Sequence, residues 1–274
     1  MTAAHRRGID VVIDETMRAL GQTSHPLAGV SDAEVRTVAV VAAAFFGTQH
    51  ARARAILRAT GYLSRALTAS RYSRRLHALA DGLALLLDVR GTLFARGQAT
   101  ICAFVIERRP LPVCTRVRAR RCRTVRGRAS GGDCPATGET FCGWHLHLVC
   151  TTDGRPVAFT LLPGGLHDLT PSHALTANLP AGAWVYGDKG YTSAPDEAVM
   201  RATGGGVLVP VHTDNMAPHT RAEHCGLRTV RRAIETAYSQ LTARGIARLH
   251  VRSGAGLEIK VHASLLALAC LNVN

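Results

Sequence analysis

Three acidic residues follow or flank segments that could present them to a shared site. Asp188 comes directly after the short apolar run Ala183-Trp184-Val185-Tyr186, which is rich in β-formers and too short for a helix. Gly187 and Gly190 flank the aspartate closely and would let a ligand approach. Because ligands bind beyond the carboxyl ends of strands in open α/β sheets, the pattern predicts a functional carboxylate. An aspartate in an ordinary turn is the alternative.

Two glutamates could complete this site. Glu107 ends the β-like run Thr100–Ile106, and Glu235 lies beside the apolar stripe of a helix predicted over Arg228–Ala243. The separations are 188 − 107 = 81 and 235 − 188 = 47 residues. Carboxylates are hard oxygen ligands, and two divalent ions held by a few of them can clamp an in-line phosphoryl transfer. We therefore expect these three acids to bind Mg²⁺ or Mn²⁺, as two ions.

The helix that carries Glu235 also carries arginines. Helical spacing places Arg228, Arg231, Glu235 and Ser239 on one face. A carboxylate flanked by arginines in this way is commonly an ordinary surface ion pair, which is the alternative to a catalytic role.

The bulk composition indicates a folded chain with a polyanionic partner. The chain has 274 residues, of which 47% are hydrophobic, enough for one large or two modest domains and against a disordered chain. Lys and Arg outnumber Asp and Glu by 33 − 19 = 14, and nearly all of the cations are arginine. Such an excess favours nucleic acid as the partner. Codon preference in a high-GC genome would produce the same excess.

Residues 1–96 are predicted to form an all-helical domain that binds DNA. A capping box of Ser31 and Glu34 precedes one of the helices. The predicted helices are Ile9–Leu20, Val35–Phe46, Gln49–Thr60 and a fourth from Tyr72 to Leu87 or beyond. Arginines make the block basic, which suits a DNA-binding domain and equally suits a solvated bundle.

Residues 97–274 are predicted to form a mixed α/β domain. Pro110 and Pro112 should end the first strand at Glu107, and Ser130–Thr140 should be a loop. A hairpin with its turn at Asp153-Gly154-Arg155 should follow. The other expected elements are strands Trp144–Cys150, Val157–Leu162 and Val207–Val211, helices Leu169–Leu179 and Pro195–Thr203, a loop over Asp214–Cys225, and a helix from Leu257.

A dense arginine cluster follows the first predicted strand. The alternation of Arg116, Arg118 and Arg120 is typical of a strand that lines one face with guanidinium groups. A phosphate backbone is the natural partner, and a solvated sheet edge is the alternative. The residues assigned to DNA contact are Arg116, Arg118, Arg120, Arg121, Arg123 and Arg126, with Lys189, Arg228 and Arg232 elsewhere in the chain.

The sequence start and the cysteines indicate a cytoplasmic protein. The segment MTAAHRRGID lacks an apolar h-region, so no signal peptide is expected, and the eight cysteines are expected to be reduced thiols. Cys134, Cys142 and Cys150 recur every eight residues near His145 and His147. This is not a standard zinc spacing, so we favour buried thiols over a structural zinc ion.

The motifs in order resemble one known family. IERRPLPVC, GWHLHLVCTTDGRPVAFTLLPGGLHD, VYGDKGY, RRAIETAYSQL and GLEIKVHASLLALACLN, preceded by SDAEVRTVAVVA and SRYSRRLHAL, are similar to segments of DDE transposases of bacterial insertion sequences. The resemblance is greatest to the IS982 family, within the IS4/IS5-like superfamily, and it covers nearly the whole chain. It implies an RNase H-like catalytic core, a nucleoid-associated enzyme that cuts and joins double-stranded DNA, and homo-oligomers assembled on that DNA.

The resemblance also implies roles for individual residues. Asp188 matches the second acidic ligand and Glu235 the third, while Arg231 matches the arginine of a Tyr-Arg-Glu-Lys signature. The tyrosine and lysine of that signature are replaced here by Arg228 and Thr242. Supporting roles are implied for three further residues, which are His147, His167 and Asp168.

The first acid departs from the family pattern. The family has Asp-Ser where this chain has Glu107-Arg108. One added methylene shifts the carboxylate by roughly 1.5 Å, and Mg²⁺ geometry is strict. We therefore expect a weakened site, with a decayed transposase that only binds DNA as the alternative function. An RNA nuclease on the same core is a third hypothesis.

Overall fold

The chain folds into two compact units, which we describe from a computed structural model. One unit comprises Met1–Val89 with Gln240–Asn274, and the other comprises Arg90–Ser239. The structure describes residues 3–97, 103–122, 124, 130–134, 138–167, 172–202, 207–211, 220–248 and 251–271. The division falls inside two helices, α5 (Ala80–Arg96) and α8 (Arg221–Ala243). The predicted functional domains, 1–96 and 97–274, follow a different boundary and stay a prediction.

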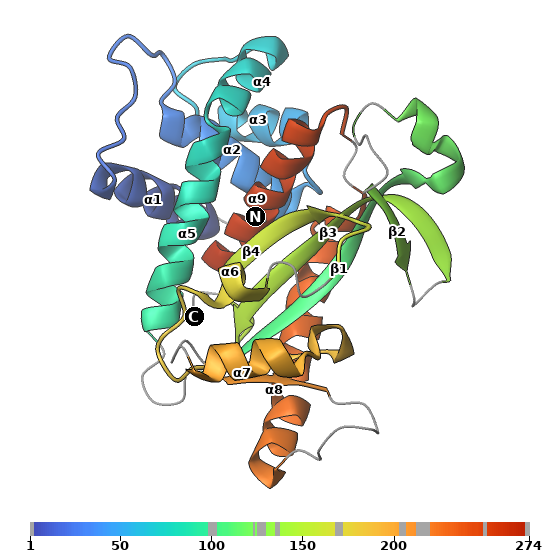
Figure 1. Cartoon of the computed structure of the whole chain (residues 1–274). Helices are drawn as coiled ribbons and strands as arrows, with labels where there is room; N and C mark the ends of the chain where they lie inside the picture. Colours follow the sequence, from blue (N-terminus) through green and yellow to red (C-terminus); the bar gives the residue numbers. More distant parts are fainter. Residues whose placement is uncertain are drawn as a thin grey trace. The chain divides into compact units, whose positions relative to one another are not determined.

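The first unit is built from helices (Figure 1). Its central helix α2 is buried from Ala33 to Ala43 apart from Glu34, and it packs against α9, which is buried over most of its length. The helices are α1 (Ala3–Ala19), α2 (Asp32–Phe45), α3 (His50–Ala59), α4 (Ala69–Ala78), the first part of α5, the short 3₁₀ helix η4 (Ile246–Arg248) and α9 (Gly254–Leu271). By length and composition α9 could cross a membrane, but 56% of it is buried inside the protein.

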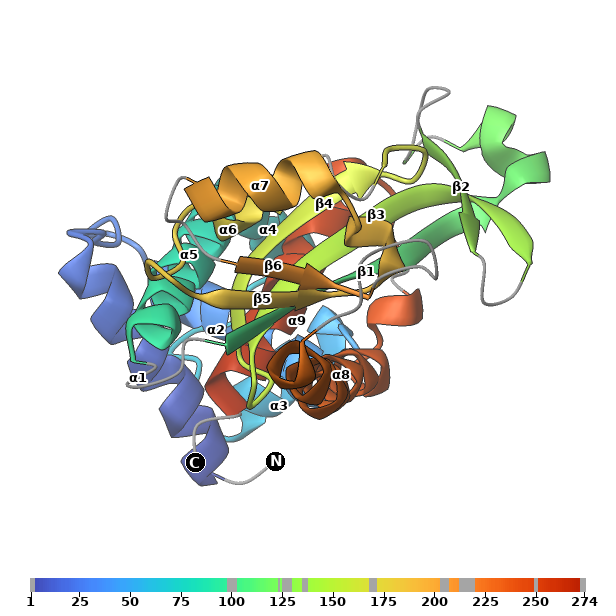
Figure 2. The same ribbon diagram turned by 60° about the horizontal axis from the view of Figure 1, so that its bottom comes forward.

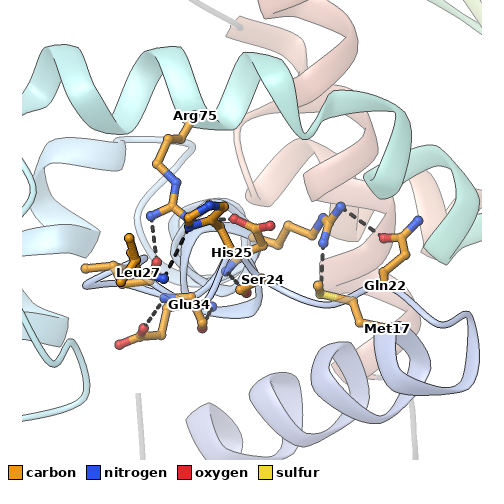
Figure 3. Close-up of polar contacts among 11 residues, drawn as sticks. Met17, Gln22, Ser24, His25, Leu27, Glu34 and Arg75 are labelled. Carbon is orange, nitrogen blue, oxygen red and sulfur yellow. Dashed lines mark hydrogen bonds and ion pairs between the residues drawn. The ribbon is translucent and has the colours of Figure 1, made fainter.

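The predicted capping box fixes the start of α2. The Ser31 hydroxyl accepts a hydrogen bond from the Glu34 amide at 3.0 Å, and the Glu34 carboxylate accepts one from the Ser31 amide at 2.6 Å. Figure 3 shows Arg75 reaching the same segment, where its guanidinium donates to the carbonyl of Val30 at 2.6 Å and pairs with Asp32. Two orphan amides and one carbonyl of the loop are thereby satisfied, which holds α2 and α4 together.

The second unit is organised around a mixed sheet. Among the described residues, six strands form it in the order β2-β3-β1-β5-β6, with β4 also paired to β3. The strands are β1 (Ala103–Thr115), β2 (Gly131–Cys134), β3 (Glu139–Thr151), β4 (Pro156–Pro163), β5 (Trp184–Gly187) and β6 (Val207–Pro210). The strand β1 runs antiparallel to β3 and parallel to β5. It therefore lies at the centre of the sheet over its first four residues.

Helices cover both faces of this sheet (Figure 2). On one face lie α6 (Ser172–Thr176), α7 (Ala194–Ala202), the 3₁₀ helix η3 (Lys189–Tyr191) and the last part of α5; α8 lies on the other. The core on the first face contains Phe104, Ile106, Val149 and Tyr191. Gly91 lets α5 approach β4, since a Cβ there would lie 1.8 Å from the carbonyl oxygen of Val157.

Several sequence predictions agree with the structure. The predicted hairpin is β3 and β4, and Gly154 in its turn has φ +80°, a conformation that favours glycine. Helices occur near the predicted limits of α2, α3, α7 and α9, and strands at the positions of β5 and β6; α1 ends where predicted but begins at Ala3 instead of Ile9. The apolar stripe Val230, Ile234 and Leu241 of α8 is buried as expected.

Five element predictions were wrong. β1 does not end at Glu107 but continues through Pro110 and Pro112 to Thr115. Strand β5 pairs only with Ala103–Ile106, so both prolines fall where, among the described residues, no strand uses that edge. The arginine run forms a 3₁₀ helix, η1 (Arg116–Arg121), instead of a strand.

The other three errors concern element limits. Part of the predicted loop 130–140 is strand β2, because a Gly-rich segment paired with β3 despite its low β-propensity. The fourth helix is two helices, α4 and α5, which are separated at Leu79. α8 begins at Arg221, inside the predicted loop 214–225; Thr220 and Glu223 exchange capping hydrogen bonds there, which the interpretation as a loop overlooked.

Candidate active site

Glu107 and Asp188 occupy matching positions on two neighbouring parallel strands. The last paired residues of β1 and β5 are Ile106 and Gly187, and each acid is the next residue along its strand. Carboxyl ends of adjacent parallel strands meet at one edge of a sheet. The register thus brings together two acids that are 81 residues apart in the chain.

The helix α8 carries the third acid beside this pair. Val230 and Ile234 of α8 are buried, and both line a pocket of about 80 Å³ that also contains Glu107, Asp188 and Arg231. Glu235 is exposed and does not line the pocket, but its negative charge acts on Glu107. Of the predicted catalytic residues, the structure therefore places three around one pocket and the fourth within electrostatic reach of it.

The pKa of Glu107 reflects its burial and the charges around it. Burial, followed by the carboxylates of Asp188 and Glu235, raises this pKa to about 7 against the opposing effect of Arg231 and Arg109. A carboxyl group with a raised pKa next to two other carboxylates is typical of a site that binds a cation or transfers a proton.

Arg231 and Glu235 form an ion pair on the exposed face of α8. The Arg231 Nε atom lies 3.1 Å from Glu235 Oε1, and the two side chains are 71% and 59% exposed. At that exposure the pair contributes little to stability. Its effect on the site is positional, because it holds the guanidinium at the pocket wall and occupies one oxygen of the third acid.

The acids fit a divalent metal in donor type. Carboxylate oxygens are the ligands that Mg²⁺ and Mn²⁺ prefer, and a cation would offset both the burial of Glu107 and the charges of Asp188 and Glu235, which together raise the pKa of Glu107. As the side chains stand, no group of three or more His, Cys, Asp or Glu within the described part of the chain is close enough to hold a metal ion. Small movements of exposed Asp188 and Glu235 would be needed to close a coordination shell.

Tyr238, which the sequence analysis did not single out, ties α8 to the strands of the site. Its hydroxyl lies 3.0 Å from the carbonyl oxygen of Glu107 and 3.1 Å from that of Leu146, so one proton is shared between β1 and β3. Arg109 lies over the tyrosine ring, 5.4 Å from its centroid. The only sequence signal was a tyrosine three residues after Glu235, on the buried side of an amphipathic helix.

The residues expected to support the site lie in different environments. His147 is fully buried on the sheet face opposite Glu107, and its Nδ1 atom lies 2.9 Å from the hydroxyl of Tyr191 in η3. Burial lowers the pKa of His147 to about 4, so its ring is neutral at pH 7. It thus contacts the turn that follows Asp188, not the pocket. His167 is exposed, and Asp168 lies outside the described residues.

The predicted DNA-contacting residues are exposed wherever the structure describes their side chains. Arg118 and Arg121 project from η1, Lys189 follows Asp188, and Arg228 and Arg232 lie on α8. Arg116 and Arg120 belong to η1, whereas Arg123 and Arg126 lie outside the described residues.

Comparison with known families identifies the chain. A family model described as "Transposase DDE domain" matches residues 96–252, which is more than half of the chain and includes Glu107, Asp188 and Glu235. The chain belongs to the DDE transposase family. Members of this family act on DNA and generally use divalent metal ions. The comparison with curated proteins gave no match, and the comparison with solved structures gave none either.

Proposed function

We propose that this transposase cuts DNA at the ends of an insertion sequence and joins them to target DNA by metal-dependent phosphoryl transfer. The observation that supports this most directly is the register between β1 and β5, which sets Glu107 beside Asp188 at one pocket. The partner would be double-stranded DNA carrying terminal inverted repeats. A homo-oligomer assembled on that DNA belongs to the same proposal.

Glu107, Asp188 and Glu235 would hold the divalent ions, Mg²⁺ or Mn²⁺. Such ions act as Lewis acids, which lower the pKa of a bound water or hydroxyl group and stabilise charge on the departing oxygen. Their binding would also favour the ionised form of Glu107, whose pKa is otherwise about 7.

The chain's other residues would bind and orient the DNA. The Arg231 guanidinium at the pocket wall is placed to contact a phosphate oxygen, while it also orients the Glu235 carboxylate. Exposed Lys189, Arg228 and Arg232 would neutralise neighbouring phosphates. Tyr238 fixes the helix α8 against the backbone of Glu107, so the third acid keeps its place while DNA binds.

The finer classification is part of the proposal. The mixed sheet with helices on both faces is consistent with an RNase H-like core, and the ordered motifs are similar to those of the IS982 family. On this basis residues 1–96 would be the DNA-binding domain and residues 97–274 the catalytic domain. A cytoplasmic, nucleoid-associated location follows from DNA as the substrate.

A second function is favoured by two observations at the acids. Glu107 stands where the family pattern has aspartate, and the ion pair with Arg231 occupies one carboxylate oxygen of Glu235. Both would weaken metal binding, which leaves a decayed transposase that binds insertion-sequence ends without cutting them.

Strand cleavage separates the two functions. Labelled DNA containing the element's own ends would be incubated with the full chain in Mg²⁺ or Mn²⁺, and the products resolved on a denaturing gel. Metal-dependent nicks at the element ends support the transposase. Binding of DNA without cleavage supports the decayed transposase. Cleavage of RNA in place of DNA would support an RNA nuclease.

A further inference from the structure

We infer that a basic pocket in the first unit binds a phosphate group of the DNA backbone. The pocket lies where the starts of α3 and α9 meet one face of α4, and all of its lining residues belong to that unit. None of them is among the residues assigned above to catalysis or DNA contact. The inference rests on the proposed function, because that function supplies the DNA.

The lining of this pocket is cationic and hydrogen-bonding. It presents two imidazoles, a guanidinium and an ammonium group together with two hydroxyls, from His50, His77, Arg252, Lys260, Ser73 and Ser253. None of the lining residues is acidic. The pocket measures about 190 Å³, several times the roughly 30 Å³ that a water molecule occupies. It therefore has room for a phosphate group and the waters around it.

His50 shows the field inside the pocket. Its Nε2 atom is buried and has no hydrogen-bond partner in the described structure. Burial, followed by the positive charges of Lys260, Arg54 and His77, lowers the pKa of His50 to about 4, and no carboxylate opposes them. An anion that entered here would meet the His50 ring nitrogen, which has no hydrogen-bond partner in the described structure, and the positive field of neighbouring cations, which together favour a phosphate group.

The start of α9 adds to the attraction. Ser253 caps this 18-residue helix by accepting a hydrogen bond from the Gly256 amide at 3.1 Å. The positive end of the helix dipole therefore faces the pocket, and glycine at position 256 leaves the backbone open to a ligand. These features reinforce the charged side chains, which carry the inference.

The experiment measures DNA binding without divalent ions, so cleavage does not enter the result. Binding of a fluorescent 20-base-pair duplex to the full chain is followed by anisotropy at several salt concentrations. Gly256→Asp places a carboxylate in the pocket, and Lys260→Gln removes one cation. Arg18→Gln in α1 is the control, because it removes the same charge from an exposed residue outside the pocket.

We expect Gly256→Asp and Lys260→Gln each to weaken DNA binding by about tenfold, and the salt dependence to fall by about one phosphate contact. Arg18→Gln should change the affinity by less than about twofold. Misfolding is a poor explanation for loss in Gly256→Asp, because an acid in the first turn favours a helix. Circular dichroism and thermal unfolding check this directly.

Three outcomes overturn the inference. The first is a DNA affinity of Gly256→Asp equal to that of a parent chain that binds DNA. This result refutes the phosphate site in the pocket and leaves the proposed function intact. The second is binding of inorganic phosphate, seen as shifts of the NMR signals of the His50 and His77 rings, while the variants keep the DNA affinity of the parent. The pocket would then bind free phosphate instead of DNA. The third is a parent chain that binds no DNA, which refutes the proposed function as well.

Discussion

Two pockets in the described structure, one in each unit, differ in the sign of the charge that they collect. The pocket in the second unit gathers carboxylates around Glu107, and the pocket in the first unit gathers cations around His50. In each, burial and like charges shift one pKa toward the neutral form, upward for Glu107 and downward for His50. Each pocket would therefore be stabilised by a ligand of opposite charge, which is the proposed metal cation at Glu107 and the proposed phosphate at His50.

The largest effect should come from removing an acid at the carboxylate pocket. Asp188→Asn deletes one of the proposed metal ligands, so strand cleavage should fall by about a thousandfold or more. DNA affinity measured without divalent ions should stay within about twofold. Asp133→Asn, an exposed carboxylate on β2, is the control and should cleave like the parent chain. Equal cleavage by Asp188→Asn and the parent would remove Asp188 from the chemistry.

A smaller gain should follow from shortening the first acid. Glu107→Asp restores the residue expected from the family pattern and withdraws the carboxylate by roughly 1.5 Å. We expect cleavage with Mg²⁺ to rise by about tenfold, because Mg²⁺ demands nearly ideal geometry. Cleavage rates of the two proteins at the same ends would be compared. Equal rates would refute the view that Glu107 weakens this site.

The anchor of α8 should have a moderate effect. Tyr238→Phe leaves the carbonyl oxygens of Glu107 and Leu146 without their shared donor, so the free energy of unfolding should fall by about 1–2 kcal/mol. Cleavage should fall while DNA affinity is kept. Tyr72→Phe is a matched control, because its buried hydroxyl has no partner in the described structure and its loss should cost nothing. A similar fall in the free energy of unfolding of both variants would contradict the view that the Tyr238 hydroxyl anchors α8 to the strands.

The smallest effect concerns pH and the basic pocket. The pKa of His50 is lowered in the folded protein, so the unfolded chain takes up its proton first as the pH falls. The stability that depends on neutral His50 should be present above about pH 6.5 and should be lost as the pH falls toward 4, by an amount on the order of 1 kcal/mol. In His50→Gln, the free energy of unfolding measured with urea should change less between these two pH values than it does in the parent protein. Parallel pH profiles for the two proteins would contradict this.

The sequence predicted the local settings of Asp188, directly after a strand, and of Glu235, on a helix, better than the elements around them. Asp188 was identified because an apolar run ends abruptly in glycines, and α8 because its period is regular; both signals are local. The end of β1 was predicted wrongly from its prolines. A missing amide hydrogen destabilises a strand only where a neighbouring strand would bond to it, and the sequence does not show where such a neighbour lies. Tyr238 was missed for a similar reason, since its partners are backbone atoms of two distant strands.

The basic pocket lay beyond sequence reasoning altogether. Its cationic and imidazole side chains come from the starts of α3 and α9 and from α4; His50 and Lys260 are 260 − 50 = 210 residues apart, and none of these residues belongs to a dense run. The arginine run at 116–128 was predicted to contact DNA instead, because the sequence shows which residues are close along the chain but not which are close in space.

Pro110 and Pro112 also bear on the solubility of the protein. They are two residues apart, so the amides they lack would have pointed to the same side of β1. Where, in the described structure, no strand pairs with β1 beyond Ile106, that side would offer a template for a strand from another molecule. Two missing donors in three residues make such pairing unfavourable, and they protect a long central strand from intermolecular aggregation while leaving the edge beside Glu107 open.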